Sequence, residues 1–235
     1  LGALALVAAL GMWRAVGAQA APAAQYTKMA PTQQYLLERG AEIALARSAA
    51  PEAISRDAQV LVLGPHGYET AVPGRNGFVC MVERGWLAGF GSPVFWNPKI
   101  HGPDCLNRAA ARSIVPIAEM KTKLVLEGKS EEEIVAAMRA AFASKTLPGL
   151  ETGAMGYMMS KAAYLTNAGG NLSHLMVFLP LTDAGAWGAG TPSLPAAASP
   201  YWFSAGGARS QLQGLPPLMV FVVGVPTWSD GSRTN

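Results

Sequence analysis

Hydrophobic and polar residues follow two different periods along this chain, one typical of strands and one typical of helices. In the first third, three short runs rich in β-branched and aromatic residues are separated by Gly, Pro and Asn: AQVLVLG at 58–64, YETAV at 68–72 and GFVCMVER at 77–84. Runs of this kind with turn residues between them are typical of consecutive strands. The pattern therefore predicts an antiparallel meander of three strands.

A helical period precedes these strands. Thr32 offers an N-cap before QQYLLERGAEIALARSA, in which Tyr35 and Ile43 belong to an apolar stripe at helical spacing. We expect a helix over 32–50, and Pro51 limits it at its C-terminal end.

Two further helices are predicted in the middle of the chain. The segment 108–127 has helical spacing, and Pro116 forces a kink or a break within it. The segment 130–145 begins with a capping box formed by Ser130 and Glu133, and an apolar stripe follows. This is the clearest single element in the sequence.

The pattern returns to strands after Pro148. The candidates are AMGYMMS at 154–160, HLMVFLPL at 174–181 and LMVFVVGV at 218–225. The last two are nearly continuous apolar runs, which predicts burial on both faces. Together these elements predict an α+β fold, with an antiparallel β-sheet core, a few packed helices and long Gly/Pro-rich loops.

Two long segments have no period and carry many aromatic residues. They span 85–107 and 182–217. The aromatic residues singled out as a ligand surface are Trp86, Phe95, Trp96, Trp187, Tyr201 and Trp202. Aromatic loops on a rigid β scaffold predict a cleft for a small apolar, aromatic or carbohydrate ligand. The alternative is that these side chains cap the open edges of the core.

The first residues have the composition of a targeting segment. LGALALVAALGMW is an apolar run too short to span a bilayer, and Ala18 and Ala20 fit an A-x-A cleavage site. We expect residues 1–20 to be a signal peptide that lacks its Met and basic n-region, 21–31 to be a lead-in, and 32–235 to form a single domain. The alternative is an uncleaved anchor. Export predicts a periplasmic or extracellular location, with no transmembrane span in the mature form.

Cys80 and Cys105 are the only two cysteines. In an oxidising compartment an even pair predicts a disulfide, whereas two free thiols or two metal ligands are the alternatives. A bridge between them closes a loop of about 25 residues and stabilises the fold by roughly 3–4 kcal/mol in the chain-entropy model. Alternation along the strand places Cys80 toward the core, as an anchor rather than a nucleophile.

The charge of the chain excludes one class of partner. Only 14% of the residues are charged and the formal net charge is +3. No dense Lys/Arg cluster occurs, so nucleic acid is not an expected partner. Catalytic signatures such as G-x-S-x-G, H-E-x-x-H, a Walker loop or C-x-x-C are absent as well.

The histidines, the scarcest titratable residues, suggest two kinds of site. His66 lies in the tight turn GPHG, where a solvent-facing side chain is expected. His101, Asp104 and His174 form a candidate metal-ligand set, because His and carboxylate ligands suit Zn²⁺ and similar ions. Structural roles for the histidines are the simpler reading.

A hydrolytic site needs a nucleophile, a base and an orienting acid. The candidate catalytic residues are Ser160, His101, His174 and Asp104, with Ser173 and Asp183 as substitutes. The chain contains these residue types, but their spacing in the sequence does not by itself predict a catalytic triad.

Several motifs resemble a group of uncharacterised exported bacterial proteins with no established activity. The resemblance rests on ARSAAPEAISRDAQVLVL, GYE, NGFVCMVER with a second downstream Cys, GYMMS, HLMVFLPL and WGAG. It covers roughly residue 46 to the C-terminus. It implies an exported α+β domain and carries over no catalytic residue. In many members of the group a Pro precedes the His that opens the apolar strand, whereas Ser173 stands there in this chain.

We therefore expect an exported protein that binds a ligand, or associates with the cell envelope, through its aromatic loops. A Ser/His/Asp hydrolase and a metal-binding protein are the alternatives. No cofactor is expected. Whether the chain is an enzyme, and its oligomeric state, stay open.

Overall fold

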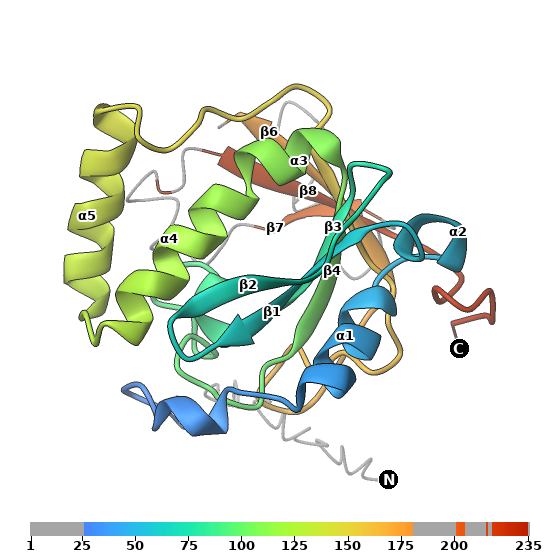
Figure 1. The fold of residues 1–235 in the computed structure, drawn as a ribbon, viewed down its shortest axis with the longest axis horizontal. Coiled ribbons are helices and arrows are strands. Elements are labelled where there is room, and N and C mark those ends of the chain that lie inside the picture. Colours follow the sequence, from blue (N-terminus) through green and yellow to red (C-terminus); the bar gives the residue numbers. More distant parts are fainter. Residues whose placement is uncertain (1–25, 181–200, 205–214, 216–217, 235) are drawn as a thin grey trace, which may run out of the picture.

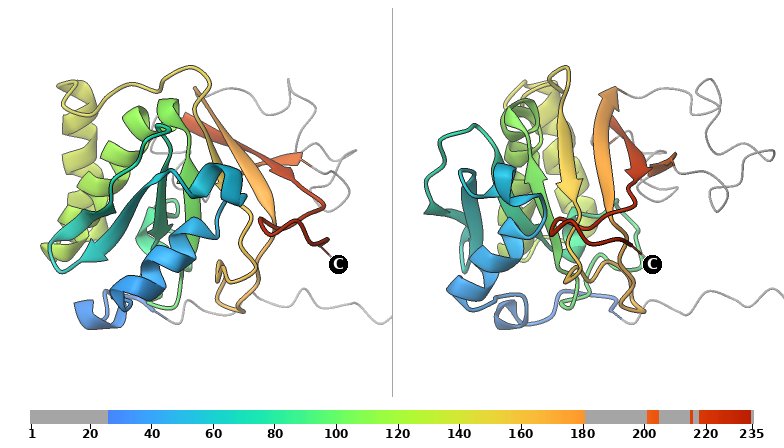
Figure 2. Two further views of the ribbon diagram at one scale, coloured as in Figure 1. Left: turned by 45° about the vertical axis from the view of Figure 1, so that its right-hand side comes forward. Right: turned by 90° about the vertical axis from the view of Figure 1, so that its right-hand side faces the viewer.

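The computed structural model describes residues 26–180, 201–204, 215 and 218–234. They form an α+β fold around one mostly antiparallel, eight-stranded sheet with the strand order β2-β1-β3-β4-β5-β6-β8-β7. The order can be followed by colour in Figures 1 and 2. The strands are β1 (Gln59–Gly64), β2 (Gly67–Val72), β3 (Val79–Glu83), β4 (Gly102–Leu106), β5 (Met155–Met158), β6 (His174–Pro180), β7 (Tyr201–Ser204) and β8 (Leu218–Gly224). The predicted fold class is confirmed.

Helices cover both faces of the sheet (Figure 1). They are η1 (Thr32–Gln34), α1 (Arg39–Arg47), α2 (Glu52–Ser55), η2 (Gly85–Leu87), α3 (Arg108–Ser113), α4 (Val115–Leu126) and α5 (Glu131–Ala143). Because side chains alternate along each strand, Cys80 and Val82 of β3 pack toward α1, whereas Val79 and Met81 pack toward α4 and α5. The central strands are therefore buried on both sides.

The predicted three-strand meander is wrong in one connection. β1 and β2 form the expected antiparallel hairpin, but β3 pairs parallel with β1 on its other side. The burial of the strands explains this order. Four residues of β1 and four of β3 are buried, as suits central strands, whereas Glu69 and Thr70 of β2 are exposed, as suits an edge strand.

The predicted helices are present, with one change of boundary. The expected helix over 32–50 divides into η1 and α1, and α1 is capped by Glu38, whose carboxylate accepts hydrogen bonds from the Gly40 and Ala41 amides. The break at Pro116 is confirmed, because α3 ends at Ser113 and the proline lies in the first turn of α4. The capping box that starts α5 is also confirmed.

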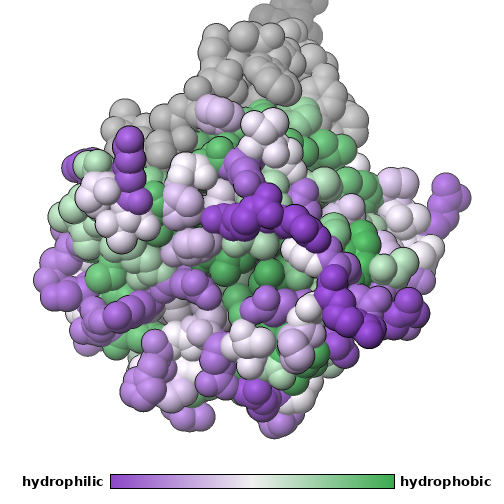
Figure 3. Space-filling model, turned by 45° about the horizontal axis from the view of Figure 1, so that its top comes forward, coloured by the Kyte–Doolittle hydropathy of each residue, from purple (hydrophilic) through white to green (hydrophobic). Residues whose placement is uncertain are grey.

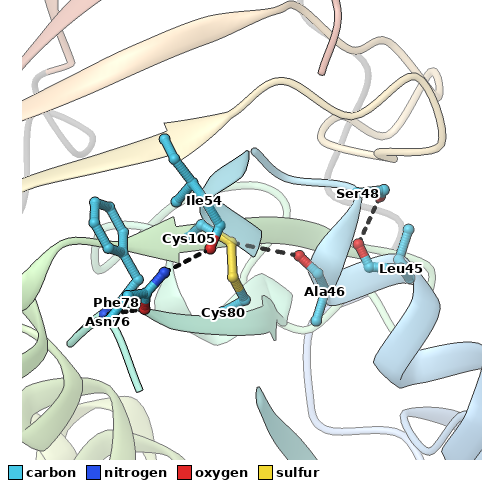
Figure 4. The surroundings of a disulfide bond; sticks show 8 residues. All are labelled: Leu45, Ala46, Ser48, Ile54, Asn76, Phe78, Cys80 and Cys105. Atoms are coloured by element: carbon cyan, nitrogen blue, oxygen red, sulfur yellow. Dashed lines mark hydrogen bonds between the residues drawn. A yellow bond between two sulfur atoms is a disulfide. The ribbon is translucent and has the colours of Figure 1, made fainter. Parts of the chain in front are cut away.

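The predicted disulfide is confirmed, but its surroundings differ from the expectation. Cys80 and Cys105 are directly paired in the antiparallel ladder of β3 and β4, and both side chains are fully buried. Figure 4 shows the bridge beside Ala46 of α1, whose carbonyl oxygen lies 3.8 Å from the Cys105 sulfur. The bridge thus joins two central strands rather than tethering a long loop, because the segment expected to be a loop over 85–107 contains β4 at its C-terminal end.

The far half of the sheet is less buried than its sequence predicts. Most side chains of β6 and β8 are half-buried, although both runs are almost wholly apolar. Figure 3 shows hydrophobic surface between hydrophilic side chains on one face of the molecule. Among the described residues, Leu172 is the one large hydrophobic residue that is strongly exposed, at 43%. No helix in the described part of the chain is long and apolar enough to cross a membrane.

We expect reduction of the Cys80–Cys105 bridge to lower the free energy of unfolding by roughly 3–4 kcal/mol, because the bridge restricts the unfolded chain over about 25 residues. Urea denaturation with and without dithiothreitol measures the difference. The Cys80→Ala/Cys105→Ala variant is the control and should not respond to the reductant. Equal stability of the oxidised and reduced proteins would contradict this role.

Candidate functional site

The structure separates the six aromatic residues that were expected to bind a ligand. Trp86 and Phe95 are core residues, 0% and 2% exposed, and the Trp86 indole N–H donates to Thr122 Oγ1 at 2.9 Å. This burial argues against the predicted ligand-contacting role for both. Trp187 and the side chains of Tyr201 and Trp202 lie outside the described part of the structure. Of the three side chains of the set that the structure describes, that of Trp96 reaches a surface hollow.

Trp96 lines an open groove of about 450 Å³. The lining residues are Thr27, Lys28, Met29, Trp96 and the run 128–133 at the turn between α4 and α5. Trp96 is half-buried and contacts Phe95 edge-on, with ring centroids 4.6 Å apart. Its indole N–H has no hydrogen-bond partner among the described residues. The groove therefore combines an aromatic surface with a free donor.

Tyr35 fixes two walls of this groove. Its hydroxyl donates to the carbonyl oxygen of Trp96 at 2.8 Å and accepts from the backbone amide of Ala30 at 3.1 Å. The ring is fully buried and packs against Trp86 at a centroid distance of 4.7 Å. Burial raises the pKa of Tyr35, so its hydroxyl keeps the proton that it donates to Trp96.

The rim of the groove carries charges of both signs. Glu133 is engaged in the capping box with Ser130 and in an ion pair with Lys129 at 3.4 Å. Glu131 accepts a hydrogen bond from the Gly91 amide. Among the described residues, Lys28 and Glu132 make no hydrogen bond or ion pair. These two side chains are free to contact a bound molecule.

A cluster of ionisable side chains lies between the sheet and α4. Glu83 and Asp104 come from the paired strands β3 and β4 and share the face that carries Met81. Lys121 of α4 is 4% exposed, and its Nζ donates to the Ala88 carbonyl at 2.8 Å. The same Nζ lies 4.0 Å from the ring centroid of Phe90.

Burial shifts the pKa values of all three groups toward their neutral forms. It raises the pKa of Glu83 to about 7, although the positive charge of Lys121 acts in the opposite direction. It lowers the pKa of Lys121 to about 7, although the negative charges of Glu131 and Glu83 act in the opposite direction. It raises the pKa of Asp104 well above its usual range; Glu83 adds to this rise, and the Tyr157 amide opposes it only in part. Neither carboxyl oxygen of Asp104 has a hydrogen bond of normal geometry. Burial therefore favours the protonated form of Asp104.

The candidate hydrolytic residues do not form a nucleophile–base pair. The Ser160 hydroxyl lies 2.6 Å from that of Ser48, and the Ser173 hydroxyl donates to the Thr227 carbonyl at 2.6 Å. No hydrogen bond joins either serine to a histidine within the described ranges. Asp183 lies outside these ranges.

Both candidate histidines have structural surroundings. His101 pairs with Tyr164 through the backbone, and burial, with Arg84 adding, lowers its pKa to about 4. His174 opens β6, and its Nδ1 lies 2.8 Å from the Leu172 carbonyl. Burial lowers the pKa of His174 as well. His66 is exposed, as expected.

The predicted metal site is not formed by the residues that the structure describes. No group of three or more His, Cys, Asp or Glu among them could hold a metal ion. The physical reason is strand alternation. His101 and Asp104 are three positions apart on one extended segment, so their side chains leave opposite faces of the sheet.

A smaller hollow of about 240 Å³ lies beside the Asn76–Gly77 turn. Gly77 has a φ of +82°, and a Cβ at this position would lie 2.7 Å from Nε of Arg108. Only glycine meets both constraints. The turn is therefore explained by backbone conformation and by the packing of Arg108.

Glu83→Gln should stabilise the protein at about pH 8 by roughly 1–3 kcal/mol and have little effect at about pH 4. The pKa of Glu83 is about 7 in the folded protein and 4.5 in the unfolded chain. The wild-type protein therefore loses stability as the pH rises from 4.5 toward 7, because Glu83 ionises more readily in the unfolded chain than in the core. Urea denaturation across this range checks the prediction. Glu52→Gln, at an exposed acid of α2, is the control. An equal effect at both pH values would rule out this reading of Glu83.

No family model, curated protein or solved structure matches the chain. The resemblance to exported bacterial proteins therefore stays a prediction.

Proposed function

We propose that this chain is a ligand-binding protein and that the groove beside Trp96 binds a short saccharide. The observation that carries the proposal is the half-buried indole of Trp96 at a groove of about 450 Å³, with its N–H unpartnered among the described residues. Ligand sites of about 300–1,000 Å³ with an aromatic surface and a few polar groups are typical of small-molecule binding.

The chemistry of the groove favours a saccharide within this class. The apolar C–H face of a sugar ring packs on an aromatic ring, and its hydroxyls need both donors and acceptors. Trp96 and Met29 offer the apolar surface, and Lys28 and Glu132 offer a donor and an acceptor. A purely apolar ligand would bury these charges without compensation.

The groove is also preformed. Tyr35 holds the backbone on both sides of it, and the capping box fixes the first turn of α5. Preorganised walls reduce the entropy that is lost when a ligand binds. These features support the binding of a ligand in the groove.

We further propose that the protein works outside the cytoplasm, in the periplasm or the extracellular space. The buried Cys80–Cys105 bridge supports this location, because structural disulfides persist in oxidising compartments. The apolar N-terminal run supports it as a targeting segment.

Trp96→Ala should weaken saccharide binding by about tenfold or more, because it removes the stacking surface. The probes are cellotriose, chitotriose, maltotriose and xylotriose, and isothermal titration calorimetry measures the affinity of each. Trp96→Phe should keep part of the affinity, since it retains an aromatic face but not the indole N–H.

The charged rim offers a matched pair of controls. Glu132→Gln should weaken binding, whereas Glu52→Gln, at an exposed acid in the first turn of α2, should not. Binding of none of the four trisaccharides, or equal binding by wild type and Trp96→Ala, would overturn the proposed function.

A further inference from the structure

We infer that Lys121 is a positioning residue for the groove, because its ammonium group holds the segment 85–97 and thereby sets the orientation of Trp96 as a function of pH. The effect of Lys121 on ligand binding rests on the proposed function. The effect of Lys121 on the position of Trp96 is independent of that function and can be measured without a ligand.

A continuous chain of contacts links Lys121 to Trp96. The Lys121 Nζ donates to the Ala88 carbonyl at 2.8 Å, and it lies 4.0 Å from the centroid of the Phe90 ring and 5.0 Å from that of Phe95. Phe95 in turn contacts Trp96 edge-on at 4.6 Å. Lys121 thus touches the segment at three points, and the last of them supports the indole.

The charged side chains that contact the segment come from other elements, because the segment carries none of its own. Residues 85–97 include no Asp, Glu, Lys, Arg or His. The ammonium attracts the electron-rich faces of both phenylalanine rings and makes a charge-assisted bond to the Ala88 carbonyl. A neutral amine loses the first interaction and weakens the second.

The groups that face Lys121 come from several elements. Glu83 of β3 and Glu131 of α5 attract its charge, and Glu131 also accepts from the Gly91 amide of the same segment. Asp104 of β4 favours its neutral form here, because burial raises its pKa well above the usual range and Glu83 adds to the rise. Tyr68 of β2 interacts with Glu83, and burial raises the pKa of its phenol, so it stays neutral.

The sign of the pH effect follows from these surroundings. Burial lowers the pKa of Lys121 to about 7, so the ammonium is present below that pH and is lost above it. The contacts of Lys121 with the segment are therefore strongest in mild acid and weaken in mild base, so that Phe95 and the Trp96 indole shift. Removing the carboxylate of Glu83 lowers the pKa of Lys121 further and moves this transition to lower pH.

The experiment follows the Trp96 indole ¹⁵N–H resonance of the full chain from about pH 5.5 to about 8.5, without ligand. The assignment comes from Trp96→Phe. Wild type should show a transition near pH 7, and Glu83→Gln should show it at lower pH. Lys121→Arg, which stays charged, should keep the acid position throughout. Lys121→Met, which has no charge, should show the basic position at every pH.

Lys123→Met, at an exposed lysine of the same helix, is the matched control and should behave as wild type. A resonance that responds neither to pH nor to Lys121→Met would overturn the role of Lys121, as would a wild-type transition in Lys121→Arg. If a trisaccharide binds, its affinity should fall at least about threefold from pH 6 to pH 8 in wild type and stay constant in Lys121→Arg. If the resonance behaves as expected and no trisaccharide binds, Lys121 keeps its role and the saccharide function fails.

Discussion

Arg84, which directly follows β3, and Glu42 of α1 form an ion pair in the interior of the protein. Their side chains are 0% and 1% exposed and 2.9 Å apart. The Arg84 guanidinium also donates to the carbonyls of Tyr35 and Val82, and Glu42 accepts from the Leu63 amide. One charge pair therefore joins η1, α1, β1 and β3. Removing either partner leaves an uncompensated buried charge, which costs about 3–5 kcal/mol in comparable cases.

This pair also sets the position of the groove. Arg84 is the last residue before the segment that carries Trp96, and it holds the backbone of Tyr35, whose hydroxyl holds the Trp96 carbonyl. Gly85 is required at the start of the segment, since a Cβ there would lie 2.1 Å from the Val94 carbonyl oxygen. The chain thus folds back tightly on itself, and the hydrogen bonds of Arg84 and Tyr35 fix both ends of the loop.

Short-range patterns in the sequence predicted most of the helices and strands, but not the order in which the strands pair. Three predicted features are confirmed: the capping box of Ser130, the break at Pro116 and the disulfide. The first two depend on a few neighbouring residues, and the third follows from the presence of two cysteines in the chain. The parallel pairing of β1 and β3 depends on contacts distant in sequence.

The sequence pattern did not predict the buried cluster of Glu83, Asp104 and Lys121. A signal was present, because Lys121 is four residues from both Ile117 and Val125, a spacing that places all three on one face of the helix. The segment 85–97 has no regular period, so its sequence did not distinguish the buried Trp86 and Phe95 from Trp96, which lines the groove.

In the proposed function, the indole of Trp96 is the surface on which a saccharide stacks. Intermolecular nuclear Overhauser effects test it most directly, with the full chain labelled and the tightest-binding trisaccharide unlabelled. If the sugar stacks on Trp96, cross-peaks should join the ring protons of Trp96 to the C–H protons of one sugar face, and resonances of Gly128 and Ser130 in the groove should shift. Cross-peaks confined to other residues, with the Trp96 ring protons unaffected at saturation, would contradict it.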